Sequence, residues 1–127
     1  MDQQKEIIMA YINAYNVFDI PKMLKNLHPD IIFENYTAEK RTVAIKGIVD
    51  FKEQALKSAT LFSERNQSIR KMVENEENNT IEVWIDYRGI LAVNMNENLK
   101  KGAEITLQGK SFFSFNDQKI SKIIDKS

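Results

Sequence analysis

Several residue types are scarce in this sequence, and each absence narrows what the protein can be. Its 127 residues contain no cysteine, two prolines and four glycines. Without cysteine the fold has no disulfide and no thiol nucleophile. No apolar run approaches the roughly 20 residues that a membrane-spanning helix needs, and the N-terminus "MDQQKEIIMAY" is too polar for a signal peptide. We therefore expect a cytoplasmic protein with no membrane partner.

Charge of one sign is not in excess either. The 18 basic and 18 acidic residues cancel, and they are interspersed along the chain. Nucleic-acid binding needs clustered basic side chains, so we expect no nucleic-acid partner. A single histidine without clustered carboxylates gives too few ligands for a metal site, and no glycine-rich loop for a phosphate or dinucleotide is present. The sequence predicts neither a metal nor a cofactor.

The apolar pattern predicts a single domain over residues 1–127, with its helices in the first half. One helix is expected from near Asp2, and a second, short helix from the N-cap residue Asp19 through Leu27. The segment "HPD" should end the second helix, because proline disfavours helix at the residue before it. The strand "DIIFENY", the extended piece "TVAIK" and a third helix after Gly47 follow.

The second half of the sequence has the alternating pattern of strands. The segments "SERNQSIRKMV", "TIEVWIDYRGILAV", "AEITLQGKSFFSF" and "KISKIID" are joined by polar turns, and residues 94–102 form a longer loop. This order predicts an α+β fold with the helices on one face of a curved antiparallel sheet. Odd-numbered positions of the long strands should face the helices. Trp84, Ile90 and Phe112 would then form an apolar patch on the outer face, and such patches commonly mark association surfaces.

Four segments together resemble a known superfamily. They are the helix "MAYINAYNVFDIPKMLKNL", the strand "DIIFEN", the helix "KGIVDFKEQAL" and the ending "GKSFFSFNDQKISKII". Their order resembles the nuclear transport factor 2-like superfamily, and within it the SnoaL-like and ketosteroid isomerase-like proteins. The resemblance implies a cone-shaped, cystatin-like fold with a pocket at its open end. It also implies a homodimer whose interface includes Trp84, Ile90 and Phe112. Enzymes, small-molecule binders and adaptors share this fold, so it does not supply the function.

The resemblance assigns possible roles to pocket residues. Tyr11 matches a tyrosine that donates a hydrogen bond to a developing oxyanion in ketosteroid isomerases. A buried phenol of this kind is either paired within the protein or offered to a ligand. Asn35 lies where those enzymes have their proton-abstracting aspartate, and an amide can orient a ligand but cannot be that base. Ser111 and Ala55 replace a second acid and a further tyrosine. These departures argue against steroid isomerisation.

Two other ionisable residues are candidates for a general base. Asp125 shares a strand face with Ile123, so it either reaches the pocket rim or is a solvated acid near the chain end. His28, in "LHPD", is either a turn residue near the surface or an acid/base group at the pocket mouth.

Three functions remain open. The first choice is binding of a small apolar or amphipathic molecule in a tyrosine-lined pocket. The second is a cofactor-independent isomerase, cyclase or dehydratase, with Tyr11 as electrophile and Asp125 or His28 as base. The third is a protein-interaction module that uses the outer sheet face. The residues predicted to bind the ligand are Tyr11, Tyr15, Phe33, Asn35, Phe51, Tyr87, Ser111 and Phe113.

Overall fold

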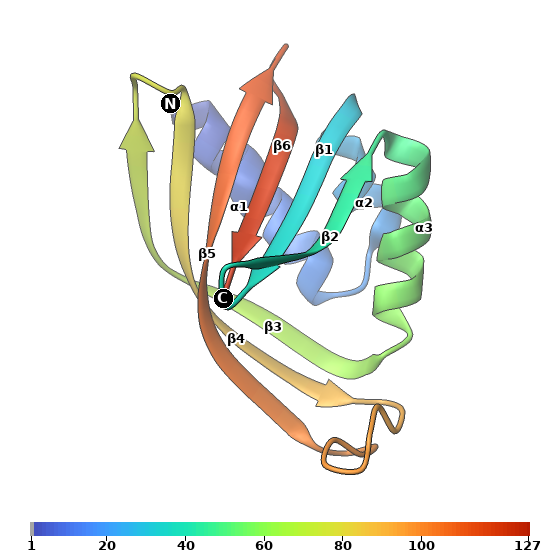
Figure 1. Ribbon diagram of the computed structural model, residues 1–127. Coiled ribbons are helices and arrows are strands. Elements are labelled where there is room, and N and C mark those ends of the chain that lie inside the picture. Colours follow the sequence, from blue (N-terminus) through green and yellow to red (C-terminus); the bar gives the residue numbers. More distant parts are fainter. Residues whose placement is uncertain (1) are drawn as a thin grey trace.

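The computed structural model describes residues 2–127, which form three helices and six strands (Figure 1). The helices are α1 (Asp2–Asn16), α2 (Ile20–Lys25) and α3 (Ile48–Ala59). The strands are β1 (Leu27–Thr37), β2 (Lys40–Lys46), β3 (Phe62–Asn75), β4 (Thr80–Leu91), β5 (Glu104–Asn116) and β6 (Lys119–Lys126). The α+β class and the division into a helical first half and a strand-rich second half are confirmed.

The strands form one sheet in the order β2-β1-β6-β5-β4-β3. Neighbouring strands are antiparallel except for β1 and β6, which run parallel. Figure 1 shows the helices on one side of the sheet, which is curved and does not close into a barrel. The predicted packing of helices on one face of a curved sheet is therefore confirmed, and it leaves a concave space between the two layers.

Two glycines allow close approaches where the long strands curve. A Cβ atom at Gly109 of β5 would lie 2.8 Å from the backbone oxygen of Lys126 at the end of β6. A Cβ atom at Gly89 of β4 would lie 2.8 Å from the ring of Phe62. Glycine inside a strand commonly marks such a site of close approach. In Figure 1, β4 and β5 turn away from β6 along their lower halves.

The core lies between α1 and the inward face of the central strands. Ile8 and Ile12 of α1 are buried against Ile81 and Val83 of β4 and Phe113 of β5. Each fully buried side chain of this size stabilises the fold by about 1.5–3 kcal/mol. The odd-numbered positions of β4 face inward as the alternation predicted, so the face that meets the helices could be read from the sequence.

The boundary between α2 and β1 corrects one prediction. The helix does not extend to Leu27; it ends at Lys25, and the "HPD" segment lies inside β1. The reason is pairing with a distant strand, because Leu27 is the partner of Ile120 of β6. The backbone N–H of Ile120 donates to the carbonyl oxygen of Asn26 at 2.9 Å. Pro29 has no N–H to donate, and a register shift in this part of β1 leaves it outside the ladder.

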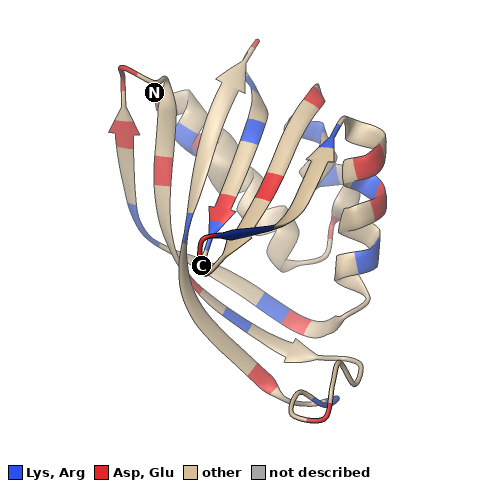
Figure 2. Ribbon diagram, viewed as in Figure 1, with Lys and Arg blue, Asp and Glu red and all other residues tan. Residues whose placement is uncertain are grey.

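The apolar association surface that the alternation predicts on the outer face of the sheet stays a prediction. Trp84, Ile90 and Phe112 are half-buried in the single chain. The ammonium groups of Lys71 and Lys110 lie 5.0 and 4.5 Å from the centre of the Trp84 ring. Figure 2 shows acidic and basic residues distributed over the strands and α3. Within residues 2–127, no helix is both long enough and apolar enough to cross a membrane.

Candidate active site

A cavity of about 430 Å³ lies between the sheet and the helices. This volume falls in the range of roughly 300–1,000 Å³ that is usual for small-molecule sites. Residues from every helix and strand border it, and most of them are apolar or aromatic. All side chains that were predicted to bind a ligand border this cavity: Tyr11, Tyr15, Phe33, Asn35, Phe51, Tyr87, Ser111 and Phe113. The predicted ligand-binding residues therefore gather around one cavity between the two layers.

Aromatic pairs hold the walls of the cavity. The rings of Phe33 and Phe51 meet edge to face with centroids 5.7 Å apart, and they join β1 to α3. The rings of Tyr11 and Phe113 meet in the same way at 6.1 Å, and they join α1 to β5. Edge-to-face pairs add about 0.5–1.5 kcal/mol to the burial of their surface. These pairs thus link the helices to the sheet across the walls of the cavity.

The carboxyl group of Asp125 is the acid of this cavity. Asp125 as a residue is half-buried, but protein atoms surround its carboxyl group. The hydroxyl of Ser111 donates a hydrogen bond of 2.5 Å to Oδ1. Burial raises the pKa of Asp125 from 3.8 to about 6, although the hydrogen bond from Ser111 opposes the shift. A carboxyl group with a pKa near 6 can accept and return a proton close to neutral pH.

Three neighbouring strands place polar side chains in a row at this point. Asn35 of β1 is the partner of Asp125 of β6, and Asp125 is the partner of Ser111 of β5. The amide of Asn35 donates to the hydroxyls of Thr42 at 2.8 Å and Thr37 at 3.3 Å. Asn35, Asp125 and Ser111 therefore lie side by side on three adjacent strands.

The hydroxyl of Tyr11 is available to a ligand. Tyr11 is 6% exposed and borders the cavity, and within residues 2–127 its hydroxyl has no hydrogen-bond partner. Burial raises the pKa of Tyr11 well above its ordinary value, and the negative charge of Asp125 raises it further. The phenol therefore stays protonated and can act as a hydrogen-bond donor. Tyr11 and Asp125 thus border the same cavity.

Tyr15 and Tyr87 form a second polar pair on the wall. Their hydroxyls lie 3.1 Å apart, and their rings meet edge to face at 6.4 Å. Burial raises the pKa of Tyr87, and the interaction with Tyr15 raises it further. Each of these hydroxyls already has a partner, in contrast to that of Tyr11.

Sequence reasoning missed Arg65. This residue of β3 borders the cavity and is only 4% exposed. Its Nε donates to the backbone oxygen of Tyr15 at 2.9 Å, at the C-terminal end of α1. Phe62, Gln67 and Met95 also border the cavity without having been predicted, and Met95 belongs to the loop between β4 and β5.

His28 lies outside the cavity lining. Its Nδ1 accepts a hydrogen bond from the backbone N–H of Asp30 at 3.0 Å, and its Nε2 lies 4.0 Å from a carboxylate oxygen of Asp117. His28 therefore belongs to the surface around the start of β1. Within the described part of the chain, residues 2–127, no three histidine, aspartate or glutamate side chains are grouped so that they could hold a metal ion.

Comparisons with known proteins give a consistent assignment. A family model for the SnoaL-like domain matches residues 8–123. A proposed SnoaL-like polyketide cyclase from Jannaschia sp. CCS1 is similar in structure, with a TM-score of 0.80, 9% identity, and coverage of 98% of this chain and 84% of that one. A proposed polyketide cyclase from Xanthomonas campestris pv. campestris has a TM-score of 0.78, 18% identity, and coverage of 99% and 90%.

A third similar structure contains a bound small molecule. It is a ketosteroid isomerase-like protein from Catenulispora acidiphila DSM 44928 in complex with trimethylamine, with a TM-score of 0.75, 10% identity, and coverage of 94% of this chain and 83% of that one. At such identities the likeness shows the fold alone. A comparison with curated protein sequences gave no match.

Proposed function

The chain belongs to the SnoaL-like domain family, and we propose that it binds a small, largely apolar carbonyl compound and moves a proton on it. It would thus be a cofactor-independent isomerase, cyclase or dehydratase. The observation that carries the proposal is the buried Asp125 carboxyl group, held by Ser111 in the same cavity as the unpartnered hydroxyl of Tyr11. A general base and a hydrogen-bond donor in the same cavity are the two groups that proton abstraction next to a carbonyl uses.

Each group has a defined role in the proposed reaction. The carboxylate of Asp125 takes a proton from the carbon next to the carbonyl group of the ligand. The electron pair of that C–H bond forms a carbon–carbon double bond, and a carbonyl electron pair moves onto the oxygen. Tyr11 donates its O–H to the negative charge that develops there. Asp125 then returns the proton to the same or another carbon, and Ser111 holds its carboxyl group in place throughout.

Binding without catalysis is the second candidate. The edge-to-face aromatic walls and the open volume of about 430 Å³ favour it, because they need no reactive group. The two candidates differ in one respect. Catalysis requires the ionised form of Asp125, whereas a binding site for a neutral ligand does not.

Hydrogen exchange on a simple ketone distinguishes the two candidates. The probe is 2-tetralone in D2O, with exchange at the carbons next to its carbonyl followed by proton NMR. The wild-type protein should exchange these protons faster than buffer alone, and Asp125→Asn should reduce the rate to that of buffer. Asp50→Asn is the matched control, because Asp50 is exposed on α3.

Each result has a clear meaning. Exchange at the buffer rate would contradict the catalytic proposal, and saturation-transfer NMR on the same sample would then show whether 2-tetralone binds. Binding without exchange would favour the second candidate. Absence of both would contradict both candidates for apolar ketones.

A further inference from the structure

Arg65 places an unusual charge beside the cavity. It lies on β3 with its side chain directed inward, and it is 4% exposed. The centre of its guanidinium group lies 3.7 Å from the centre of the Tyr15 ring and 4.4 Å from that of Phe18. Only its Nε is paired, with the backbone oxygen of Tyr15. Both terminal nitrogens, Nη1 and Nη2, are buried and lack a hydrogen-bond partner within residues 2–127.

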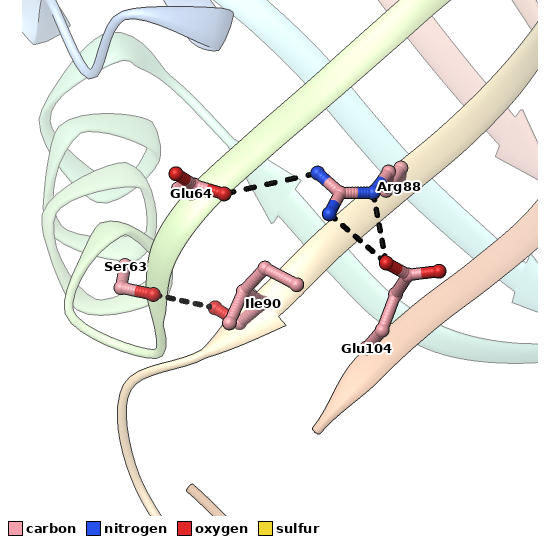
Figure 3. Close-up of polar contacts among 5 residues, drawn as sticks. All are labelled: Ser63, Glu64, Arg88, Ile90 and Glu104. Carbon is pink, nitrogen blue, oxygen red and sulfur yellow. Dashed lines mark hydrogen bonds and ion pairs between the residues drawn. The ribbon is translucent and has the colours of Figure 1, made fainter. Parts of the chain in front are cut away.

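An arginine on the outer face of the same sheet, Arg88, forms ion pairs with carboxylates and provides a comparison. Arg88 of β4 is exposed, and its Nε and Nη2 lie 3.0 and 2.9 Å from a carboxylate oxygen of Glu104 (Figure 3). Its Nη1 lies 3.7 Å from Glu64, so one arginine links three strands. Arg65 has no carboxylate within 4.0 Å in the described part of the chain. The exposed Arg88 is therefore paired with carboxylates, whereas the terminal nitrogens of the buried Arg65 are not.

The hydrogen bond of Arg65 Nε compensates only part of the cost of burying the guanidinium charge. A guanidinium stays protonated in proteins, and burial without a counterion is costly. The C-terminal end of α1 and two aromatic faces compensate partly, because both favour a positive charge. These contacts explain why the side chain is held at this position. They leave the terminal nitrogens, which suit the two oxygens of a carboxylate, without an acceptor.

The side chain that carries these nitrogens borders the cavity of the proposed reaction site. Arg65 borders the same cavity as Tyr11, Tyr15 and Tyr87. Otherwise the wall in this region is aromatic, with Phe62 and Tyr87 meeting edge to face at 6.0 Å. Two lysines, Lys110 and Lys126, also border the cavity, but their ammonium groups lie over the rings of Trp84 and Phe112, 4.5 and 5.3 Å from the ring centres. Because Nη1 and Nη2 are buried and the Tyr15 ring covers the guanidinium, their contact with a ligand requires that the ring or the guanidinium move.

We propose that Arg65 is the anion-recognising residue of this cavity, and that the ligand is a small, mainly apolar molecule that carries a carboxylate. This inference rests on the proposed function for its location but adds a substrate class to it. The carboxylate pairs with Nη1 and Nη2, while the apolar body contacts the aromatic walls. Arg65 would then position the ligand, and its reacting carbonyl would lie toward Tyr11 and Asp125.

A matched pair of probes tests the inference without any turnover. The anion 2-naphthoate and the neutral amide 2-naphthamide have nearly the same shape. Their dissociation constants are measured by isothermal titration calorimetry at pH 8, where Asp125 is ionised. The wild-type protein should bind 2-naphthoate at least about tenfold more tightly, because a charge-assisted pair is gained. Arg65→Gln should lose this preference while it still binds 2-naphthamide.

Two further variants keep the test decisive. Arg88→Gln removes a guanidinium from the outer face and should leave the preference unchanged. Arg65→Lys keeps the charge but not the two-point geometry, so the preference should decrease and not vanish; this variant decides the question if Arg65→Gln does not fold. Equal affinity of the wild-type protein for the two probes, or no binding of 2-naphthoate up to its solubility limit, would overturn the inference.

The outcome is separable from that of the proposed function. Exchange on neutral 2-tetralone depends on Asp125 and Tyr11 and needs no anion. A protein that exchanges 2-tetralone but does not prefer 2-naphthoate would refute the role of Arg65 alone. A protein that prefers 2-naphthoate but does not exchange 2-tetralone would refute the catalytic role alone.

Discussion

Ser111 on β5 and Asp125 on β6 are direct partners across two antiparallel strands, and the serine hydroxyl donates to the aspartate carboxylate at 2.5 Å. Both residues border the same cavity, and the hydrogen bond holds the carboxyl group of Asp125 beside Ser111. Burial and this hydrogen bond act in opposite directions on the pKa of Asp125, and burial dominates. Several expectations depend on this balance.

The proposed exchange reaction should depend on the ionisation of Asp125. Its pKa of about 6 predicts that the rate on 2-tetralone rises as the pH increases through about 6 and then levels off. The pH–rate profile of the wild-type protein measures this directly. Asp125→Asn should give a flat profile at the buffer rate. A wild-type profile without a step at a pH of about 6 would contradict the assignment of Asp125 as the base.

Removal of the serine hydroxyl should move that step upward. The hydrogen bond from Ser111 lowers the pKa of Asp125, so Ser111→Ala should shift the midpoint of the pH–rate profile above that of the wild-type protein. The plateau rate should change less than the midpoint, since the carboxylate itself remains. Ser114→Ala is the control, because Ser114 is a nearby serine of β5 that does not border the cavity. An unchanged midpoint in Ser111→Ala would show that the hydrogen bond does not act on the ionisation.

Stability should depend on pH in the direction set by a raised pKa. Folded Asp125 binds its proton more tightly than the unfolded chain does, with pKa values of about 6 and 3.8. Its contribution to the free energy of unfolding is therefore fully present below pH 3.8 and is lost as the pH rises through about 6. Above that range the buried ionised group destabilises the fold by about 3 kcal/mol, because a difference of one in pKa corresponds to about 1.4 kcal/mol. Urea unfolding of the wild-type protein and Asp125→Asn should show the variant to be the more stable at pH 8, with the difference shrinking toward pH 4.

Tyr11→Phe should reduce the exchange rate with little effect on stability. The hydroxyl has no partner within residues 2–127, so its removal costs the folded state little. Loss of a donor to a developing oxyanion commonly lowers a rate by about 10²–10³-fold. Exchange kinetics and urea unfolding on one preparation separate the two effects. Tyr36→Phe is the matched control, because the Tyr36 hydroxyl donates to Glu34 and Tyr36 does not border the cavity. Equal rates for Tyr11→Phe and the wild-type protein would remove Tyr11 from the mechanism.

The outer sheet face predicts a homodimer, which stays a proposal. Light scattering coupled to size exclusion should give twice the mass of the 14.8 kDa chain. Trp84→Arg should shift the mass toward that of one chain, because it places a charge in the centre of the apolar patch. Val49→Lys on α3 is the control, since Val49 is 68% exposed on another surface. A wild-type protein of single-chain mass would contradict the prediction.

The alternation of apolar and polar residues predicted the inward face of a strand where the alternation is regular. It did not predict strand pairing where a register shift interrupts the ladder. The two-residue turn at Asp117 and Gln118 pairs Asn116 with Lys119, and extension of that register would place Ile124 opposite Ser111. A register shift at Phe115 moves Asp125 into that place instead. Nothing in the local sequence announces this shift, so the key contact of the site needed the structure.

Arg65 escaped prediction for a related reason. Arg65, Gln67 and Ile69 lie on the inward side of β3, but a register shift before Lys71 interrupts the alternation along the strand. Without a continuous apolar pattern, the inward face of β3 could not be identified. An arginine at an inward position would otherwise have been a clear signal, since arginine is rarely buried without a partner.

The pairing of β1 with β6 lay beyond sequence reasoning as well. Parallel neighbours that are far apart in the chain leave no local signal, and Asn35 and Asp125 meet only through this pairing. The neighbourhood of Asn35 therefore could not be derived from its own segment, although the segment itself was correctly predicted as a strand.

The position of β6 also has a kinetic consequence. This strand lies between β1 and β5 inside the sheet, so its pairing brings the chain's end to a segment from its first third. Such distant closures tend to be slow steps in folding, because the loop must lose its freedom before the contact forms. A strand with neighbours on both sides also cannot fray independently of the rest. The burial of the Asp125 carboxyl group should therefore occur late during refolding and be lost together with the global structure during unfolding. Asp125 would thus report on the final cooperative step of folding.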